Sequence, residues 1–127
     1  MYRIAVLTTC KAQETFFTGQ IARFCAERGL FPAIEAFRDQ ERFFEAAQKT
    51  PPEKAIIALP GVDGLNAAEH LRALLPETRI IWCSDLDFSL HAFRLRVDHF
   101  LLEPVTEEAL RQGLTIWFEE KTPRARL

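Results

Sequence analysis

Residues 54–65 read KAIIALPGVDGL, and this stretch decides the fold. Its apolar residues run to Leu59, where Pro60 and Gly61 interrupt them. A short apolar run between two longer helical patterns, bounded by turn residues, is typical of a buried strand. Asp63 and Gly64 predict the turn that closes the following loop. We therefore expect a strand that delivers its loop to the sheet edge where ligands of open α/β folds bind.

The composition fits one globular domain. The chain has 127 residues, of which 48% are hydrophobic and 27% charged, and its net charge is −2. This charge excludes a basic nucleic-acid-binding field. No apolar run reaches membrane-spanning length, and the start MYRIAVLTTC lacks the layout of a signal peptide. We expect a cytoplasmic location, with no membrane contact and no direct nucleic-acid binding.

The cysteines predict neither a disulfide framework nor structural zinc. Cys10, Cys25 and Cys83 are odd in number and contain no Cys-x-x-Cys pair. Cys25 is expected in the core. Cys10 and Cys83 fall near the ends of two strands, which raises a weaker hypothesis of a redox sensor. One full strand should separate them, which is too far for a disulfide bond.

Strand and helix patterns alternate on both sides of the central strand. The apolar stripe Phe17, Ile21, Phe24 and Cys25 indicates an amphipathic helix. The alternation predicts a parallel sheet with helices on both faces. The expected strands are 2–7, 30–37, 79–84 and 99–102, and the expected helices are 11–28, 39–49 after an Asp39 cap, 66–75 after an Asn66 cap, 88–95 and 106–120.

In this order, the segments resemble the receiver domains of response regulators, most of all receivers that precede LytTR-type DNA-binding domains. The stretches that carry the resemblance are IAVLTT (4–9), LPGVDGLNAAEHLR (59–72), RIIWCSD (79–85) and HAFRLRVDHFLLEPV (91–105), with the final amphipathic helix. The resemblance spans roughly Tyr2 to Phe118. It implies a flavodoxin-like α/β fold, a five-stranded parallel sheet of order 2-1-3-4-5 with helices on both faces. It also implies one receiver-like domain over residues 1–120. Residues 121–127 would then be the start of a linker to a DNA-binding output domain, or a frayed tail.

Family receivers transfer a phosphoryl group to an aspartate at the end of the third strand. Two acids hold Mg²⁺, a Thr or Ser ends the fourth strand, and a Lys precedes the proline after the fifth. Here these positions fall on Thr8 and Thr9 for the acids, Ala58 for the acceptor (Ile56 if the loop before Pro60 is not shortened), Cys83 for the hydroxyl and Glu103 for the lysine. Neutral hydroxyls are poor Mg²⁺ ligands, and Glu103 repels a phosphoryl group. The resemblance therefore predicts a degenerate site without catalytic residues, metal or cofactor.

Two details of the backbone also follow from the resemblance. The bond before Pro104 is expected to be cis, as it usually is in the family. Arg96 stands where the family has a glycine after the fourth helix, so we expect that turn to be rebuilt.

The remaining polar residues support alternatives. A relocated metal or phosphoacceptor site could use the acids near the expected edge, with Asp85 as the first candidate acceptor; these acids are Asp63, Asp85, Asp87 and Glu103. Alternatively, Asp63 suits a turn, and Asp85 or Asp87 suits a helix cap. His70, His91 and His99 show no metal-ligand spacing.

The leading hypothesis is a non-enzymatic, phosphorylation-independent pseudo-receiver. It would act as a homodimer or bind a partner through the fourth helix, fifth strand and fifth helix. The alternatives are an active receiver phosphorylated at Asp85 and a small flavodoxin-like ligand-binding protein or enzyme. Thr8–Lys11 is not the glycine-rich phosphate loop that a nucleotide-binding protein would place after its first strand. The candidate interface residues are Phe88, His91, Arg94, Leu95, His99 and Phe100.

Overall fold

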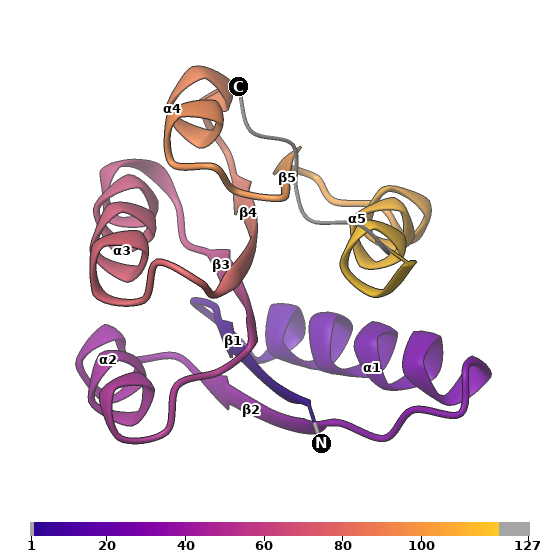
Figure 1. Cartoon of the computed structure of the whole chain (residues 1–127). Coiled ribbons are helices and arrows are strands. Elements are labelled where there is room, and N and C mark those ends of the chain that lie inside the picture. Colours follow the sequence, from indigo (N-terminus) through magenta and orange to yellow (C-terminus); the bar gives the residue numbers. More distant parts are fainter. Residues whose placement is uncertain (1, 120–127) are drawn as a thin grey trace.

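The computed structural model describes residues 2–119, in which a parallel sheet lies between two layers of helices (Figure 1). The sheet order β2-β1-β3-β4-β5 confirms the predicted order. The strands are β1 (Arg3–Leu7), β2 (Ala33–Phe37), β3 (Lys54–Ala58), β4 (Arg79–Ser84) and β5 (His99–Leu102). The helices are α1 (Lys11–Glu27), α2 (Gln40–Lys49), α3 (Gly61–Leu74), α4 (Ser89–Arg94) and α5 (Glu107–Glu119). The expected boundary at residue 120 and the segment 121–127 lie outside the described residues. None of the helices within 2–119 has the length and apolar character that crossing a bilayer requires.

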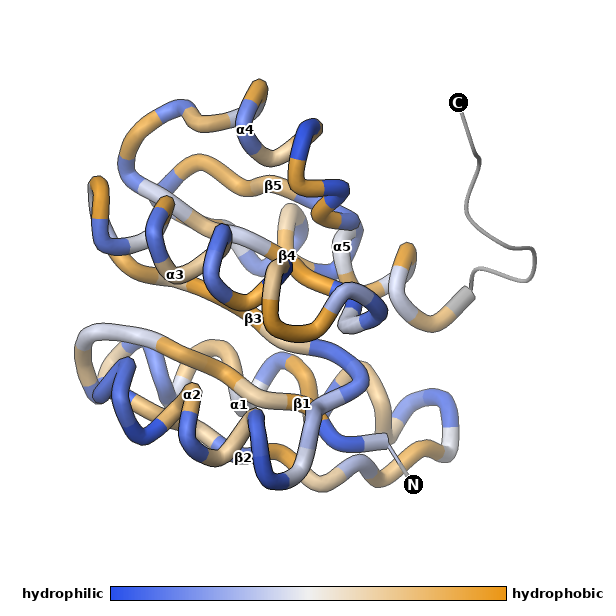
Figure 2. Tube along the Cα trace, turned by 60° about the vertical axis from the view of Figure 1, so that its left-hand side comes forward, coloured by the Kyte–Doolittle hydropathy of each residue, from blue (hydrophilic) through white to orange (hydrophobic). Residues whose placement is uncertain are grey.

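The sheet separates two hydrophobic cores. Helices α1 and α5 cover one face, and α2, α3 and α4 cover the other (Figure 1). Alternate residues of β3 enter the two cores, with Ile56 and Ala58 on the α1–α5 face and Ile57 on the opposite face. In Figure 2, hydrophobic colour runs along β3 and β4 and alternates with hydrophilic colour along the helices. The apolar run that predicted a buried strand therefore lies at the centre of the molecule.

Several local signals act as the sequence predicts. The α1 stripe of Phe17, Ile21, Phe24 and Cys25 is fully buried. Asp39 caps α2, because its carboxylate accepts a hydrogen bond from the Glu41 backbone N–H at 3.0 Å.

The start of α3 differs from the prediction. The helix begins at Gly61, so Asn66 is an exposed residue within the helix and not its cap. Asp63 lies in the first helical turn, where its charge favours the helix dipole. Gly64 is a helical residue and not part of a turn. A Cβ atom added to Gly64 would lie 2.4 Å from the Leu59 carbonyl oxygen, so only glycine lets the helix start this close to the end of β3.

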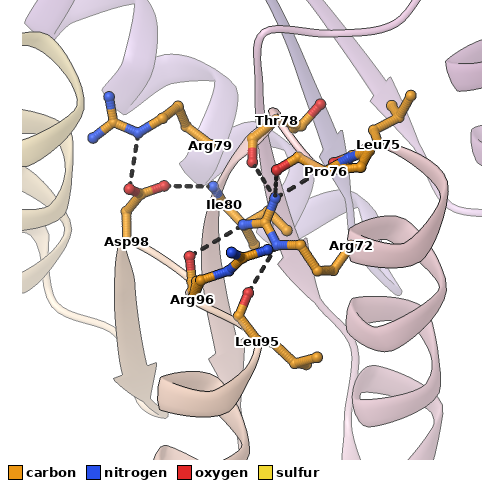
Figure 3. Close-up of polar contacts among 9 residues, drawn as sticks. All are labelled: Arg72, Leu75, Pro76, Thr78, Arg79, Ile80, Leu95, Arg96 and Asp98. Carbon is orange, nitrogen blue, oxygen red and sulfur yellow. Dashed lines mark hydrogen bonds and ion pairs between the residues drawn. The ribbon is translucent and has the colours of Figure 1, made fainter. Parts of the chain in front are cut away.

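The turn after α4 also differs from the prediction. It is not rebuilt, because Arg96 itself adopts the left-handed conformation, with φ of 56°. This conformation costs a non-glycine residue roughly 1–2 kcal/mol. Arg72 of α3 helps to hold it (Figure 3), since its guanidinium donates to the carbonyl oxygens of Leu95 at 2.8 Å and Arg96 at 3.1 Å.

The same buried guanidinium closes the end of α3. Arg72 also donates to the carbonyl oxygens of Leu75 at 3.4 Å, Pro76 at 2.9 Å and Thr78 at 2.8 Å. Arg72 thus joins the segment that follows α3 to the turn that follows α4 through backbone carbonyl oxygens. We call these contacts of Arg72 the Arg72 clamp. Next to it, the Asp98 carboxylate accepts from the Ile80 backbone N–H at 2.7 Å and pairs with Arg79 (Figure 3).

We predict opposite effects for alanine at two helical glycines. Gly64→Ala should lower the free energy of unfolding by roughly 1–3 kcal/mol, because the new methyl group meets the Leu59 carbonyl. Gly19→Ala in α1, with open space around its Cβ position, should raise it by about 0.5–1 kcal/mol. Urea unfolding measures both, and equal effects would contradict the close approach at Gly64.

We predict a large cost for removing the Arg72 clamp. Arg72→Met should lower the free energy of unfolding by roughly 2–4 kcal/mol, because backbone carbonyls lose their donors in a buried setting. Arg42→Met is the control. The Arg42 side chain is 81% exposed and pairs with Asp39 at 3.8 Å, so its loss should cost less than about 0.5 kcal/mol. Indistinguishable unfolding midpoints for the two variants would show that the clamp contributes little.

Candidate functional site

The ends of the parallel strands meet at one edge of the sheet, which we call the carboxyl edge. Buried Thr8 follows β1 and continues its ladder, because its backbone N–H donates to the Phe37 carbonyl at 3.0 Å. Exposed Thr9 comes next, and Glu103 follows β5. The cis peptide bond between Glu103 and Pro104 lies at the same edge.

The two candidate acceptor positions are placed differently. Ala58 is the last residue of β3, and Ile56 lies within the strand, fully buried in the core. Ala58 therefore occupies the strand end that faces the edge, and Ile56 does not. Neither side chain carries an oxygen or nitrogen atom to which a phosphoryl group could be transferred.

The fourth strand ends on Ser84, which confirms the expected strand 79–84. Cys83 lies one residue earlier, and its thiol is packed in the α1–α5 core, where burial and then the Glu103 carboxylate raise its pKa. The Ser84 hydroxyl accepts from the Leu86 backbone N–H at 3.1 Å and donates to Asp85 at 3.5 Å. The resemblance placed the family's hydroxyl position on Cys83 and gave no role to Ser84. The signal was present, since Ser84 is the first polar residue after the apolar residues 80–83.

A chain of side-chain hydrogen bonds crosses this edge. The Thr9 hydroxyl donates to Gln13 Oε1 at 3.1 Å, and Gln13 Nε2 donates to Glu103 Oε2 at 3.2 Å. Gln13 comes from the first turn of α1, so it links the end of β1 to the end of β5. Beside this chain lies a cavity of about 320 Å³, lined by Gln13, Glu103 and apolar residues that include Phe16 and Val105. An uncharged amide thus holds the Glu103 carboxylate.

Two other acidic residues at this edge, Asp85 and Asp87, accept hydrogen bonds from the starts of different helices. Asp85 Oδ1 accepts from the Gly61 backbone N–H at 2.8 Å and joins the loop before α3 to the loop before α4. Asp87 accepts from the Ser89 hydroxyl at 2.6 Å and the Ser89 backbone N–H at 3.0 Å, and these bonds lower its pKa. Asp87, rather than Asp85, therefore makes the cap-like contact at α4. Within residues 2–119, no three His, Cys, Asp or Glu side chains gather closely enough to hold a metal.

The cysteines and histidines are dispersed. Cys10 is exposed, whereas Cys25 and Cys83 are buried, and all three are free thiols. His70 stacks on Phe44 with ring centroids 4.0 Å apart, and His99 is half-buried, which lowers its pKa.

The candidate interface residues differ in how deeply they are buried. Phe88 stacks on Trp82 at 5.4 Å and Phe100 contacts the same ring edge-on, so both belong to the packing beneath α4. His91, Leu95 and His99 are half-buried, and Arg94 is exposed. The sequence reasoning missed the apolar residues that do face outward here. These are Leu86 in the loop before α4 and Leu90 and Phe93 on the helix, exposed by 50%, 60% and 72%. We call these three residues the α4 stripe.

No protein-family model and no curated protein matches this sequence. Solved structures do match it. The chain is similar to the BeF3-activated receiver domain of DrrB from Thermotoga maritima, with 20% identity, TM-score 0.69, and coverage of 94% of this chain and 99% of that one. A LuxR-family two-component response regulator from Aurantimonas sp. matches with 20% identity, TM-score 0.71, and coverage of 88% and 81%. An orphan response regulator of H. pylori matches with 14% identity, TM-score 0.65, and coverage of 89% and 92%. The chain therefore has the fold of response-regulator receiver domains, and its affinity to LytTR regulators stays a prediction.

Proposed function

We propose that this chain is a receiver domain of a two-component response regulator that signals without phosphoryl transfer. The observation that carries the proposal is the chemistry at the carboxyl edge. Thr8 and Thr9 follow β1, the Ala58 methyl ends β3, and a carboxylate stands at Glu103. Phosphoryl transfer needs an acceptor oxygen, a divalent cation and positive charge near the moving oxygens. These positions supply hydroxyl, methyl and negatively charged groups instead.

A side-chain hydrogen bond also connects two loops at the carboxyl edge. The Asp85 carboxylate sits on the Gly61 N–H at the start of α3, where an anion is favourable. The loops before α3 and α4 are therefore joined by an internal anion. This contact supports a signalling state that needs no added phosphoryl group.

For the output, we propose that a second copy of the chain packs on the α4 stripe. Leu86 before α4 and Leu90 and Phe93 on α4 present apolar side chains to solvent, and Arg94 of the same helix is also exposed. Apolar and aromatic residues with arginine are typical of an interface core and its surroundings. Beneath this stripe, Phe88 and Trp82 give α4 a rigid base.

The absence of phosphoryl transfer is tested with a small phosphodonor and Mg²⁺. We expect no gain of phosphate mass in intact-protein mass spectrometry and no saturable amide shifts near Thr8, Ala58 or Ser84 with beryllofluoride. A stable mass gain would refute the proposal. If Asp85→Asn then abolished that gain, the function would be that of an active receiver with a displaced acceptor.

The dimer is tested with a pair of exposed phenylalanines. We expect sedimentation equilibrium to show a concentration-dependent dimer that Phe93→Asp weakens by roughly tenfold or more, because a charge replaces a buried ring. Phe31→Asp is the matched control, since Phe31 is 76% exposed and Phe93 is 72% exposed, but Phe31 lies before β2. A monomer at all concentrations, or equal effects of the two variants, would exclude this dimer.

A further inference from the structure

Lys54, the first residue of β3, is a buried cation at the edge of the sheet opposite the carboxyl edge. Only 6% of the residue is exposed. Its Nζ lies 4.3 Å from the centre of the Tyr2 ring and 5.0 Å from that of Phe118. Among residues 2–118, no oxygen atom accepts a hydrogen bond from this Nζ. Two aromatic faces stabilise the ammonium group, but its N–H donors have no acceptor there.

The carboxylates near Lys54 interact with other residues. Glu53 accepts from the Arg3 backbone N–H at 2.9 Å, and Asp98 pairs with Arg79 at 2.8 Å. Burial, followed by the positive charge of Arg79, lowers the pKa of Lys54, against the smaller opposing effects of Glu53 and Asp98. An added negative charge at Lys54 would therefore be favourable.

Lys54 also lines a cavity of about 460 Å³, a volume in the range of small-molecule sites. The walls are mainly apolar, formed by Tyr2, Pro51, Pro52, Leu75 and Pro76. Glu53, Glu77 and Arg79 line the same cavity. Arg79 is paired with Asp98 at 2.8 Å, so the two carboxylates make a second negative charge on a ligand unfavourable.

We propose that this cavity binds a small monocarboxylic acid with an aromatic or branched apolar body, whose carboxylate accepts hydrogen bonds from the Lys54 ammonium group. The carboxylate supplies the acceptor that Lys54 lacks, and a charge-assisted bond of this kind is strong in a buried setting. The apolar body packs against the prolines and Leu75. Only one carboxylate is accommodated, because Glu53 and Glu77 face the same space.

This site adjoins the Arg72 clamp. The loop that forms one wall supplies the carbonyls of Leu75, Pro76 and Thr78, which bind Arg72 and through it the end of α4. A ligand in the cavity therefore contacts the loop that helps to position α4. The site itself stands independently of the proposed function, since it uses none of the residues of the carboxyl edge.

The test is a fluorine NMR titration of the full chain with 4-fluorophenylacetate, compared with the neutral isostere 4-fluorophenylacetamide. We expect saturable binding of the acid and at least about tenfold weaker binding of the amide, because only the acid carries the charge that pairs with Lys54. Lys54→Met should weaken binding of the acid by a similar factor. Lys49→Met, at an exposed end of α2, should leave it unchanged.

A second measurement keeps the result interpretable if Lys54→Met does not fold. In the unaltered chain with isotope-labelled lysine, the side-chain resonance of Lys54 should shift with the acid and saturate at the same concentration. Absence of saturable binding at millimolar acid, equal binding of acid and amide, or an unshifted Lys54 resonance would overturn the proposal. Binding that survives Lys54→Met in a folded chain would also overturn it.

Discussion

Burial of β3 on both faces is the constraint on which the rest of the structure depends. All five residues of this strand are buried, so the sheet needs a layer of helices on each side. Burying side chains such as Ile56 and Ile57 contributes about 1.5–3 kcal/mol each. The same strand begins with Lys54 and ends with Ala58, so its position fixes one residue at each of the two opposite edges of the sheet. A buried ammonium lies at one edge, and a methyl group ends the strand at the other.

The layer of α2, α3 and α4 needs a further interaction, because α4 is short and lies over the edge of the sheet. Arg72 provides it with one planar guanidinium that reaches five carbonyl oxygens at the ends of two helices. Arginine suits this position better than lysine, since its donors are fixed in a fork and its charge is less strongly hydrated. The contact with the Arg96 carbonyl offsets part of the cost of a left-handed arginine at the end of α4. The α4 stripe therefore rests on a buried polar contact as well as on aromatic packing.

The two edges of the sheet carry different kinds of polar group. At the carboxyl edge, polar groups satisfy one another, through Thr9, Gln13 and Glu103 on one side and through Gly61 and Asp85 on the other. At the opposite edge, Lys54 keeps a positive charge against aromatic rings beside an apolar cavity. The chain thus combines the receiver fold with hydroxyl, methyl and carboxylate groups at its carboxyl edge. The buried Lys54 side chain therefore lies at the opposite end of β3 from the Ala58 methyl group.

Local pattern by itself determined the alternation of strands and helices and the buried stripe of α1, because hydropathy periodicity is a property of neighbouring residues. The resemblance to receivers added the strand order. Only the tertiary structure decided the start of α3, where Gly64 lies close to the Leu59 carbonyl, and the hydrogen bonds of the Ser84 hydroxyl. It also decided that Arg72 is buried and that Arg96 keeps the turn. The partners of Arg72 include carbonyls more than 20 residues away, and the partner of Asp85 is an N–H 24 residues away. No local sequence signal encodes such pairs, because they exist only once the sheet brings its loops together.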